Sequence, residues 1–581
     1  MFSFVSLCCA RLAPFSLLTT DALTYAAAML SLSELGRSTL VRVPTAKQSS
    51  RTKRPVLTSR GALALAFGLL GGGCASLDPE PPESFSEPGG LFASVAQVEL
   101  GSRLEDAVIH FTRDGKAPTV EDPVYAAPLQ LEQTTEVRSL AVGADGRMEL
   151  MDGLFLRVSD GTVDFSSNLP VLVVHMLGAP EPSAESFVYE RAGMLMFEPS
   201  DVDGRTRLAD PPTVVSRVGF KVRGRTSRYD DKHGFSLELW GTVDQDDVSR
   251  SLLGMPEESD WALYAPYKKD RCYMRNALMY ALSNDMGRYA VRTRFVELFI
   301  VGDHDDLRAS DYAGVYMFME RLTRNAERID VKKNKGGPDE DISGGYIVEI
   351  DQPGPNEQEV GFEIDGMRLE YVYPKVEDIT PAQQEYLTTY LENVVSAIEQ
   401  AADGVDRGVP HYSELIDVDS FIDFHILNTF SKNPDALRLS SYMHKERGQP
   451  LAAGPIWDFD RALGSYDERS KPTSGWSPGG DGTQLFAYKF WGALFADEGF
   501  RRSYIRRFRD VLAGPLSERN VHAHIDRFAA ELEEAAVRNS ARWPDARPWG
   551  GEFSNEVSDL RKWTSERLRW MEEQLEAGEL E

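Results

Sequence analysis

Residues 428–464 read NTFSKNPDALRLSSYMHKERGQPLAAGPIWDFDRALG, and this stretch carries most of the evidence for the fold. A helix is predicted over residues 418–431, and the triplet Asn433-Pro434-Asp435 directly after it favours a turn. Strands are predicted over 438–444 and 451–456, joined by a turn that contains Gly and Pro. The order of elements therefore places one carboxylate in a loop after a helix, and further carboxylates directly after a hairpin.

The carboxylates of this stretch suit phosphoryl transfer. That reaction needs a phosphate-binding turn, a cation on the phosphates, carboxylates for a divalent metal ion, and a carboxylate beside the attacking hydroxyl. Asp435 could accept the proton of the attacking hydroxyl, and Asp458 could hold Mg²⁺. Asp460 and Asn433 are both candidates for a further metal ligand, and the sequence does not choose between them.

A candidate phosphate-binding turn lies earlier in the chain. Arg223-Gly224-Arg225-Thr226-Ser227-Arg228 separates two predicted strands; its glycine permits close backbone approach, and its arginine and serine side chains offer donors to phosphate. Lys232 precedes the second strand, and Glu320 ends a later one, where it could pair with a phosphate-binding lysine. The alternative for both residues is an ordinary solvated charge on the surface.

A series of short motifs between residues 214 and 575 stands in the order found in one known family. In this order the motifs resemble the CotH family, atypical protein kinases first met in bacterial spore coats. The matching motifs are Val222-Arg223-Gly224 with Ser227, Lys232, Asp260-Trp261-Ala262-Leu263 with Asp270, Arg275-Asn276, Phe295-Val296-Glu297-Leu298, Gly314-Val315-Tyr316 with Glu320, Gly344-Gly345-Tyr346-Ile347-Val348-Glu349, Asn433-Pro434-Asp435 and Gly454-Pro455-Ile456-Trp457-Asp458-Phe459-Asp460.

The resemblance implies an α+β fold, a two-lobed atypical protein-kinase-like domain over residues 210–581. It implies ATP with Mg²⁺ or Mn²⁺ as cofactors, and transfer of the γ-phosphate to serines of a secreted or coat protein. The implied roles are catalysis for Asp435, metal binding for Asp458 with Asp460 or Asn433, and nucleotide binding for Arg223, Gly224, Ser227 and the pair Lys232 and Glu320.

Two features depart from the family pattern. Residues 303–311 form an acidic insertion where the family has a short turn; a cation site and a solvated loop are both open, and the second is favoured. Ser440 stands where protein kinases place the asparagine that holds a second metal ion. Two other functions also stay open: a surface, coat-assembly or adhesion protein that only binds a partner, and transfer of AMP instead of phosphate.

Composition excludes several classes of protein. The chain has 581 residues, 42% of them hydrophobic, and 91 acidic against 63 basic residues give a net charge of −28. This balance argues against nucleic-acid binding, which needs a basic face, and is compatible with a basic protein substrate. Of the four cysteines only Cys272 lies in the expected folded body, so neither a disulfide framework nor a Cys-rich zinc site is predicted there.

The N-terminal region resembles a bacterial lipoprotein leader. Residues 61–70, GALALAFGLL, follow a basic stretch and are too short to span a bilayer. Gly71-Gly72-Gly73-Cys74 resembles a lipobox, which predicts export and a lipid anchor at Cys74 on the bacterial cell envelope or surface. A plain secretory signal and a buried helix are the alternatives. Residues 1–74 are assigned to this leader, with an over-extended start, and residues 75–89 to a polar tether.

The rest of the chain divides into an all-β part and a mixed part. Residues 90–200 are predicted to form a small β-sandwich, because Ile109–Thr119 with Tyr125 and Pro128 resembles the C-terminal module of chitobiase-type enzymes. A spacer is the favoured role, and carbohydrate binding is kept by analogy. Further strands are predicted near 214–222, 235–239, 294–301, 314–319 and 345–350, and helices from the capping box at Thr380-Pro381-Ala382-Gln383 and over 517–539 and 556–576.

Overall fold

The computed structural model of the chain describes residues 88–242, 245–337, 339–352 and 361–580. The predicted leader (1–74) and nearly all of the predicted tether (75–89) lie outside the described residues, so both stay predictions. No helix in the described ranges combines the length and the apolar character that crossing a membrane requires.

An N-terminal module of strands confirms the predicted all-β region. Its main sheet has the order β1-β6-β5-β3, and a second sheet pairs β2 with β4. Side chains from both sheets share one hydrophobic core, among them Val98, Leu131, Val137 and Phe155. The strands are β1 (Gly89–Phe92), β2 (Ala96–Val98), β3 (Val108–Thr112), β4 (Leu129–Leu131), β5 (Thr135–Val142) and β6 (Met148–Arg157).

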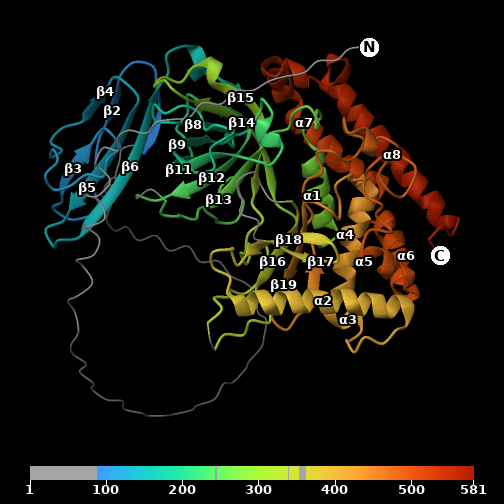
Figure 1. The fold of residues 1–581 in the computed structure, drawn as a ribbon. Helices are drawn as coiled ribbons and strands as arrows, with labels where there is room; N and C mark the ends of the chain where they lie inside the picture. Colours follow the sequence, from blue (N-terminus) through green and yellow to red (C-terminus); the bar gives the residue numbers. More distant parts are fainter. Residues whose placement is uncertain (1–87, 243–244, 338, 353–360, 581) are drawn as a thin grey trace, which may run out of the picture. The chain divides into compact units, whose positions relative to one another are not determined.

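Seven strands then close into a barrel in the order β11-β12-β13-β15-β14-β8-β9 (Figure 1). Only the pairing of β8 with β14 is parallel. Alternating residues of β11, including Val218, Phe220 and Val222, fill the interior. The barrel strands are β8 (Val171–His175), β9 (Glu190–Phe197), β11 (Val214–Arg223), β12 (Gly234–Trp240), β13 (Asp260–Tyr264), β14 (Thr293–Val301) and β15 (Tyr312–Glu320).

The barrel corrects one predicted boundary. The sequence assigned residues 90–200 to the β-sandwich module, but β8 and β9 pair with β14 and β11 and belong to the barrel. All five residues of β8 are buried, because its two faces contribute to different cores: Leu172 and Val174 to the barrel interior, Val171 and Val173 to a core outside it. Sequence alone could not assign β8, since its partner β14 lies far along the chain.

A five-stranded sheet and a set of helices form the rest of the chain, with the sheet order β17-β18-β16-β19-β20. The predicted capping box at the start of α2 is present, with Thr380 and Gln383 each bonding the other's backbone. The strands are β16 (Tyr346–Ile350), β17 (Gly361–Ile364), β18 (Met367–Tyr373), β19 (Ser441–Lys445) and β20 (Leu451–Ala453). The longer helices are α1 (Arg275–Asp285), α2 (Pro381–Asp403), α4 (Val418–Ser431), α6 (Glu498–Ala513), α7 (Glu518–Arg542) and α8 (Phe553–Glu576).

The acidic insertion is attached to the protein surface. The Asp305 carbonyl accepts a hydrogen bond from Thr134 Oγ1 at 2.6 Å and lies 2.9 Å from His175 Nε2. Leu307 forms a β-bridge to Val158, just after β6. The insertion therefore connects the N-terminal module to the barrel. Neither hypothesis from the sequence, a solvated loop or a cation site, included this role.

Candidate functional site

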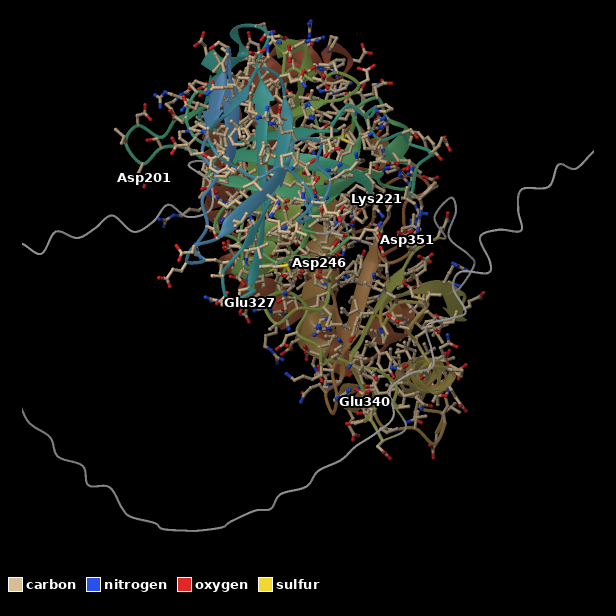
Figure 2. The ribbon with its side chains drawn as sticks, turned by 90° about the vertical axis from the view of Figure 1, so that its left-hand side faces the viewer. Asp201, Lys221, Asp246, Glu327, Glu340 and Asp351 are labelled. Carbon is tan, nitrogen blue, oxygen red and sulfur yellow. The ribbon has the colours of Figure 1, made fainter. Side chains whose placement is uncertain are left out.

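A cleft of about 690 Å³ lies between the barrel and the five-stranded sheet. Its barrel side comes from the ends of β11, β12 and β13, and its other side from β16, β19 and the segments before and after the β19–β20 hairpin. Figure 2 labels Lys221 of β11 and Asp351, directly after β16, and both line the cleft.

The charge of the cleft opposes the charge of the chain. Ten lysines and arginines line it against seven aspartates and glutamates, whereas the whole chain carries 63 basic and 91 acidic residues. A local excess of cations on an acidic protein concentrates anionic ligands. The basic residues of the cleft are thus suited to bind a polyanion, and its carboxylates are suited to bind a metal ion that accompanies the polyanion.

Asp435 lies in the turn after α4 and lines this cleft. Its backbone N–H donates to Asn433 Oδ1 at 3.2 Å, and Asn433 Nδ2 donates to the Asp458 carbonyl at 3.2 Å. Asn433 is 3% exposed, and the cleft lining does not include it. Its amide therefore ties the two carboxylate-bearing loops together, and its role as a metal ligand stays a prediction.

Asp458 and Asp460 face the same cleft, and helix α1 positions them. Asn276 Oδ1 accepts a hydrogen bond from the Phe459 N–H at 2.6 Å, and the Tyr280 hydroxyl lies 3.4 Å from the Asp458 nitrogen. These contacts hold the backbone on both sides of the first carboxylate.

The environment of both carboxyls disfavours their negative charge. Asp458 is exposed within the cleft, yet the surrounding protein displaces enough water to raise the pKa of its carboxyl, against the opposing charge of Lys269. Burial and then the neighbouring Asp458 charge raise the pKa of Asp460 well above its ordinary value. A bound cation would relieve this repulsion. Among the residues that the structure describes, no three His, Cys, Asp or Glu side chains form a ready-made metal cage.

The backbone around these carboxylates is unusually strained. Of the twelve non-glycine residues with positive φ in the described ranges, five fall between residues 432 and 463. Asp458 is one, at φ 59°. Such conformations cost about 1–3 kcal/mol each and concentrate at functional sites. The other four are Lys432, Leu437, Ser440 and Leu463.

The turn between β11 and β12 brings the predicted phosphate-binding residues to the cleft. Gly224 has φ 107°, and a Cβ there would lie 2.3 Å from Ser227 Oγ, so only glycine fits. Arg223 lies in the wall of the cleft with its guanidinium 5.5 Å from the Trp457 ring centroid. It forms no ion pair within the part of the chain that the structure describes. Burial lowers the pKa of Arg223, as expected for an uncompensated cation.

Lys232 and Glu320 do not form the ion pair that the sequence predicted. Lys232 Nζ donates to the carbonyls of Pro266 and Val315 at 3.2 and 2.6 Å and to Asn539 Oδ1 at 3.0 Å. Burial lowers the pKa of this lysine well below its ordinary value. The side chain points inward, towards α7, because three buried oxygens there need a donor.

Glu320 is satisfied elsewhere in the barrel. Its carboxylate accepts from Arg292 Nη1 at 2.7 Å and from the Tyr289 hydroxyl at 3.0 Å, and Arg328 lies 3.6 Å away. It is 0% exposed and is not part of the cleft lining. The geometry therefore gives Glu320 a structural position.

Two families of known proteins match the chain. Residues 220–571 match the CotH kinase protein family, which is more than half of the chain. The chain belongs to the CotH family. Residues 87–151 match the chitobiase/beta-hexosaminidase C-terminal domain, in agreement with the N-terminal module. No curated protein matches the chain.

In this CotH chain the cleft holds charged residues that sequence reasoning missed. Arg461 follows Asp460 directly, and Lys269 precedes Asp270 of a quoted motif. Glu349, quoted in a family motif but given no role, faces the cleft, where burial and then Asp351 raise its pKa to about 8. The available signal was adjacency to a family motif, which does not tell which way a side chain points.

Proposed function

We propose that this CotH family member is an atypical kinase, which transfers the γ-phosphate of ATP to a serine hydroxyl of a protein outside the cytoplasm. The observation that supports this most directly is the convergence, in one cation-rich cleft, of Asp435 with Asp458 and Asp460. Family membership supports the same reaction class.

The residues of the cleft fit the two groups that the reaction needs. Asp458 and Asp460 offer carboxylate oxygens, the ligands that Mg²⁺ uses in proteins, and their raised pKa values mark negative charge in need of a cation. Such an ion supplies charge neutralisation to phosphate oxygens. Arg223 and the Gly224 turn are placed to bind phosphate, by charge and by close backbone approach.

Asp435 is the group that would receive the proton. The serine oxygen forms a bond to the γ-phosphorus as the bond from phosphorus to the bridging oxygen breaks, and ADP leaves with that oxygen. The hydroxyl proton passes to the Asp435 carboxylate. Arg223 replaces Lys232 as the cation that we assign to the nucleotide, because Lys232 is committed to three buried oxygens.

The test is transfer of label from γ-labelled ATP by residues 75–581, with Mg²⁺ and then Mn²⁺, to the protein itself and to a basic Ser-rich acceptor. Label should appear with the wild-type chain and be lost with Asp458→Asn, in which the metal loses a charged ligand. Intact mass separates the transferred groups, since phosphate adds about 80 Da and AMP about 329 Da. Label that persists in Asp458→Asn would contradict the assigned role.

One observation favours a second function, a surface or coat-assembly protein that binds a partner without catalysis. The Asp435 carboxylate is paired with Arg438 and lies within 4 Å of two further arginines. A base so engaged must be released before it can accept a proton. No label transfer and no thermal shift with nucleotide would favour this second function, as would a wild-type phenotype in Asp435→Ala.

A further inference from the structure

Three guanidinium groups surround the Asp435 carboxylate, and they differ in how firmly they are held. Arg438 donates a hydrogen bond to Asp435 Oδ1. Arg469 lies 3.8 Å from Asp435 Oδ1 but donates two hydrogen bonds to Asp467, at 2.9 and 2.6 Å. Among the described residues, Arg461 forms only two ion pairs, and both are long: 3.7 Å to Asp435 Oδ2 and 3.8 Å to Asp467 Oδ2.

Arg461 is the least committed cation of the three. Both of its ion pairs exceed hydrogen-bond length. Its guanidinium makes no hydrogen bond to any other side chain or carbonyl in the described ranges. Its side chain is 32% exposed and lines the cleft, whereas Arg469 is 16% exposed and lies outside the lining.

Arg461 shares the cleft with both sets of carboxylates. It directly follows Asp460 in the chain, and it lines the same cleft as Asp458 and Asp460, the proposed metal ligands. It also approaches Asp435, the proposed proton acceptor. A phosphoryl group transferred from a nucleotide held at Asp458 and Asp460 to a hydroxyl at Asp435 would therefore lie within reach of this guanidinium.

We propose that Arg461 is a catalytic residue that binds the transferred phosphoryl group during its passage from ATP to the acceptor hydroxyl. This inference rests on the proposed kinase function. Negative charge spreads over the three peripheral oxygens of the phosphoryl group in the transition state, and a planar guanidinium binds two such oxygens at once.

The same movement would free the proton acceptor. In the described structure Arg461 partly neutralises Asp435 Oδ2 across 3.7 Å. When the guanidinium turns to the phosphoryl group, that oxygen becomes available for the serine proton. The base would thus be released only when a phosphoryl group is present, which accounts for the engaged state of Asp435.

The experiment compares Arg461→Gln and Arg461→Lys with Arg469→Gln, which removes an equal charge at nearly equal distance from Asp435. Steady-state transfer gives kcat and KM for ATP. Calorimetry gives the Kd of Mg²⁺-ADP with and without aluminium fluoride, a planar mimic of the transferred group. Thermal melting checks that each variant folds, and Arg461→Lys keeps the charge if Arg461→Gln does not fold.

We expect Arg461→Gln to lower kcat by about 10²–10³-fold with KM within about threefold of wild type, because the contact forms mainly in the transition state. The extra affinity for ADP that aluminium fluoride provides should disappear. The kcat of Arg461→Lys should stay below about a tenth of the wild-type value, since an ammonium group cannot donate two parallel hydrogen bonds from one plane as a guanidinium does. Arg469→Gln should stay within about threefold on both measures.

Two results would overturn the inference. An Arg461→Gln variant that keeps kcat and the fluoride-dependent affinity would remove Arg461 from catalysis while the kinase function stands. If Arg469→Gln lowered kcat as much as Arg461→Gln does, Arg461 would contribute only to the overall charge around Asp435 and not to catalysis. If the wild-type chain neither transfers phosphate nor binds ADP more tightly with aluminium fluoride, the proposed function fails and this inference fails with it.

Discussion

The two sides of the cleft are built differently. The barrel side consists of hydrogen-bonded strand ends, and its predicted lysine, Lys232, lines the cleft but directs its ammonium group into a buried contact with α7. The other side consists of turns, and its predicted carboxylates, Asp435 and Asp458, line the cleft, with Asp458 itself in a strained conformation at positive φ. The difference teaches that motif residues in turns kept their predicted place here, whereas a charged residue beside a strand was drawn into the core.

The largest expected effect concerns the turn side. Asp435→Asn keeps the shape of the side chain but removes the proton acceptor, so phosphoryl transfer should fall by about 10²–10⁴-fold. Nucleotide affinity should change by less than about twofold, because we assign binding to the barrel side. Single-turnover transfer and equilibrium binding of ATP separate the two quantities. A large loss of ATP affinity would erase the division between the two sides.

The next effect concerns the barrel side. Arg223→Gln removes a cation with no ion-pair partner in the described part of the chain, so it should weaken ATP binding by roughly 10- to 100-fold, the value of a charge-assisted hydrogen bond. Protein stability should be unchanged or slightly higher, because the burial that lowers the pKa of Arg223 opposes its charge. Isothermal titration with ATP and thermal melting test both parts. Unchanged affinity would leave the cleft without its assigned phosphate anchor.

Lys232→Met should have the opposite effect to Arg223→Gln, because it should lower protein stability and leave ATP affinity almost unchanged. The variant leaves the Pro266 and Val315 carbonyls and Asn539 Oδ1 without this donor, at a cost of about 1–3 kcal/mol in the free energy of unfolding. ATP affinity should stay within about twofold. Denaturant unfolding beside nucleotide titration measures the two effects. If the variant binds ATP much more weakly while its free energy of unfolding is almost unchanged, Lys232 contacts the nucleotide.

The smallest effect is a dependence of stability on pH. Burial raises the folded-state pKa of Glu349 from 4.5 to about 8. The folded chain therefore holds this proton more tightly than the unfolded chain, and the resulting stability is present below pH 4.5 and is lost as pH rises towards 8. Glu349→Gln, which stays uncharged, should gain stability relative to wild type as the pH rises from 5 to 8.5, and the partial exposure of the side chain keeps this gain below the roughly 4 kcal/mol that the full pKa shift would give. Melting curves at both pH values test this, and equal differences would show that Glu349 titrates normally.

Many helices and strands were predictable because residues close together in the sequence determine where these elements begin and end. The capping box at Thr380 and the predicted helix 418–431 are both present, and most predicted strands lie within a few residues of their place. The predictions failed where contacts between residues distant in sequence determine the place of a strand or the direction of a side chain. β8 joined the barrel through β14, and Lys232 found Asn539 on α7. Arg461 was missed for a related reason, since only the fold brings it to Asp435.

The position of β8 and β9 also affects how the chain can be divided. Neither family match covers residues 152–219, yet this stretch supplies β8, β9 and most of β11. A fragment that began at residue 220 would leave β14 without β8 and would keep only the last four residues of β11 beside β12, and open strand edges promote aggregation between molecules. The matched region alone is therefore not an autonomous folding unit. Poor solubility of such a fragment would reflect an opened barrel rather than a defect in the cleft.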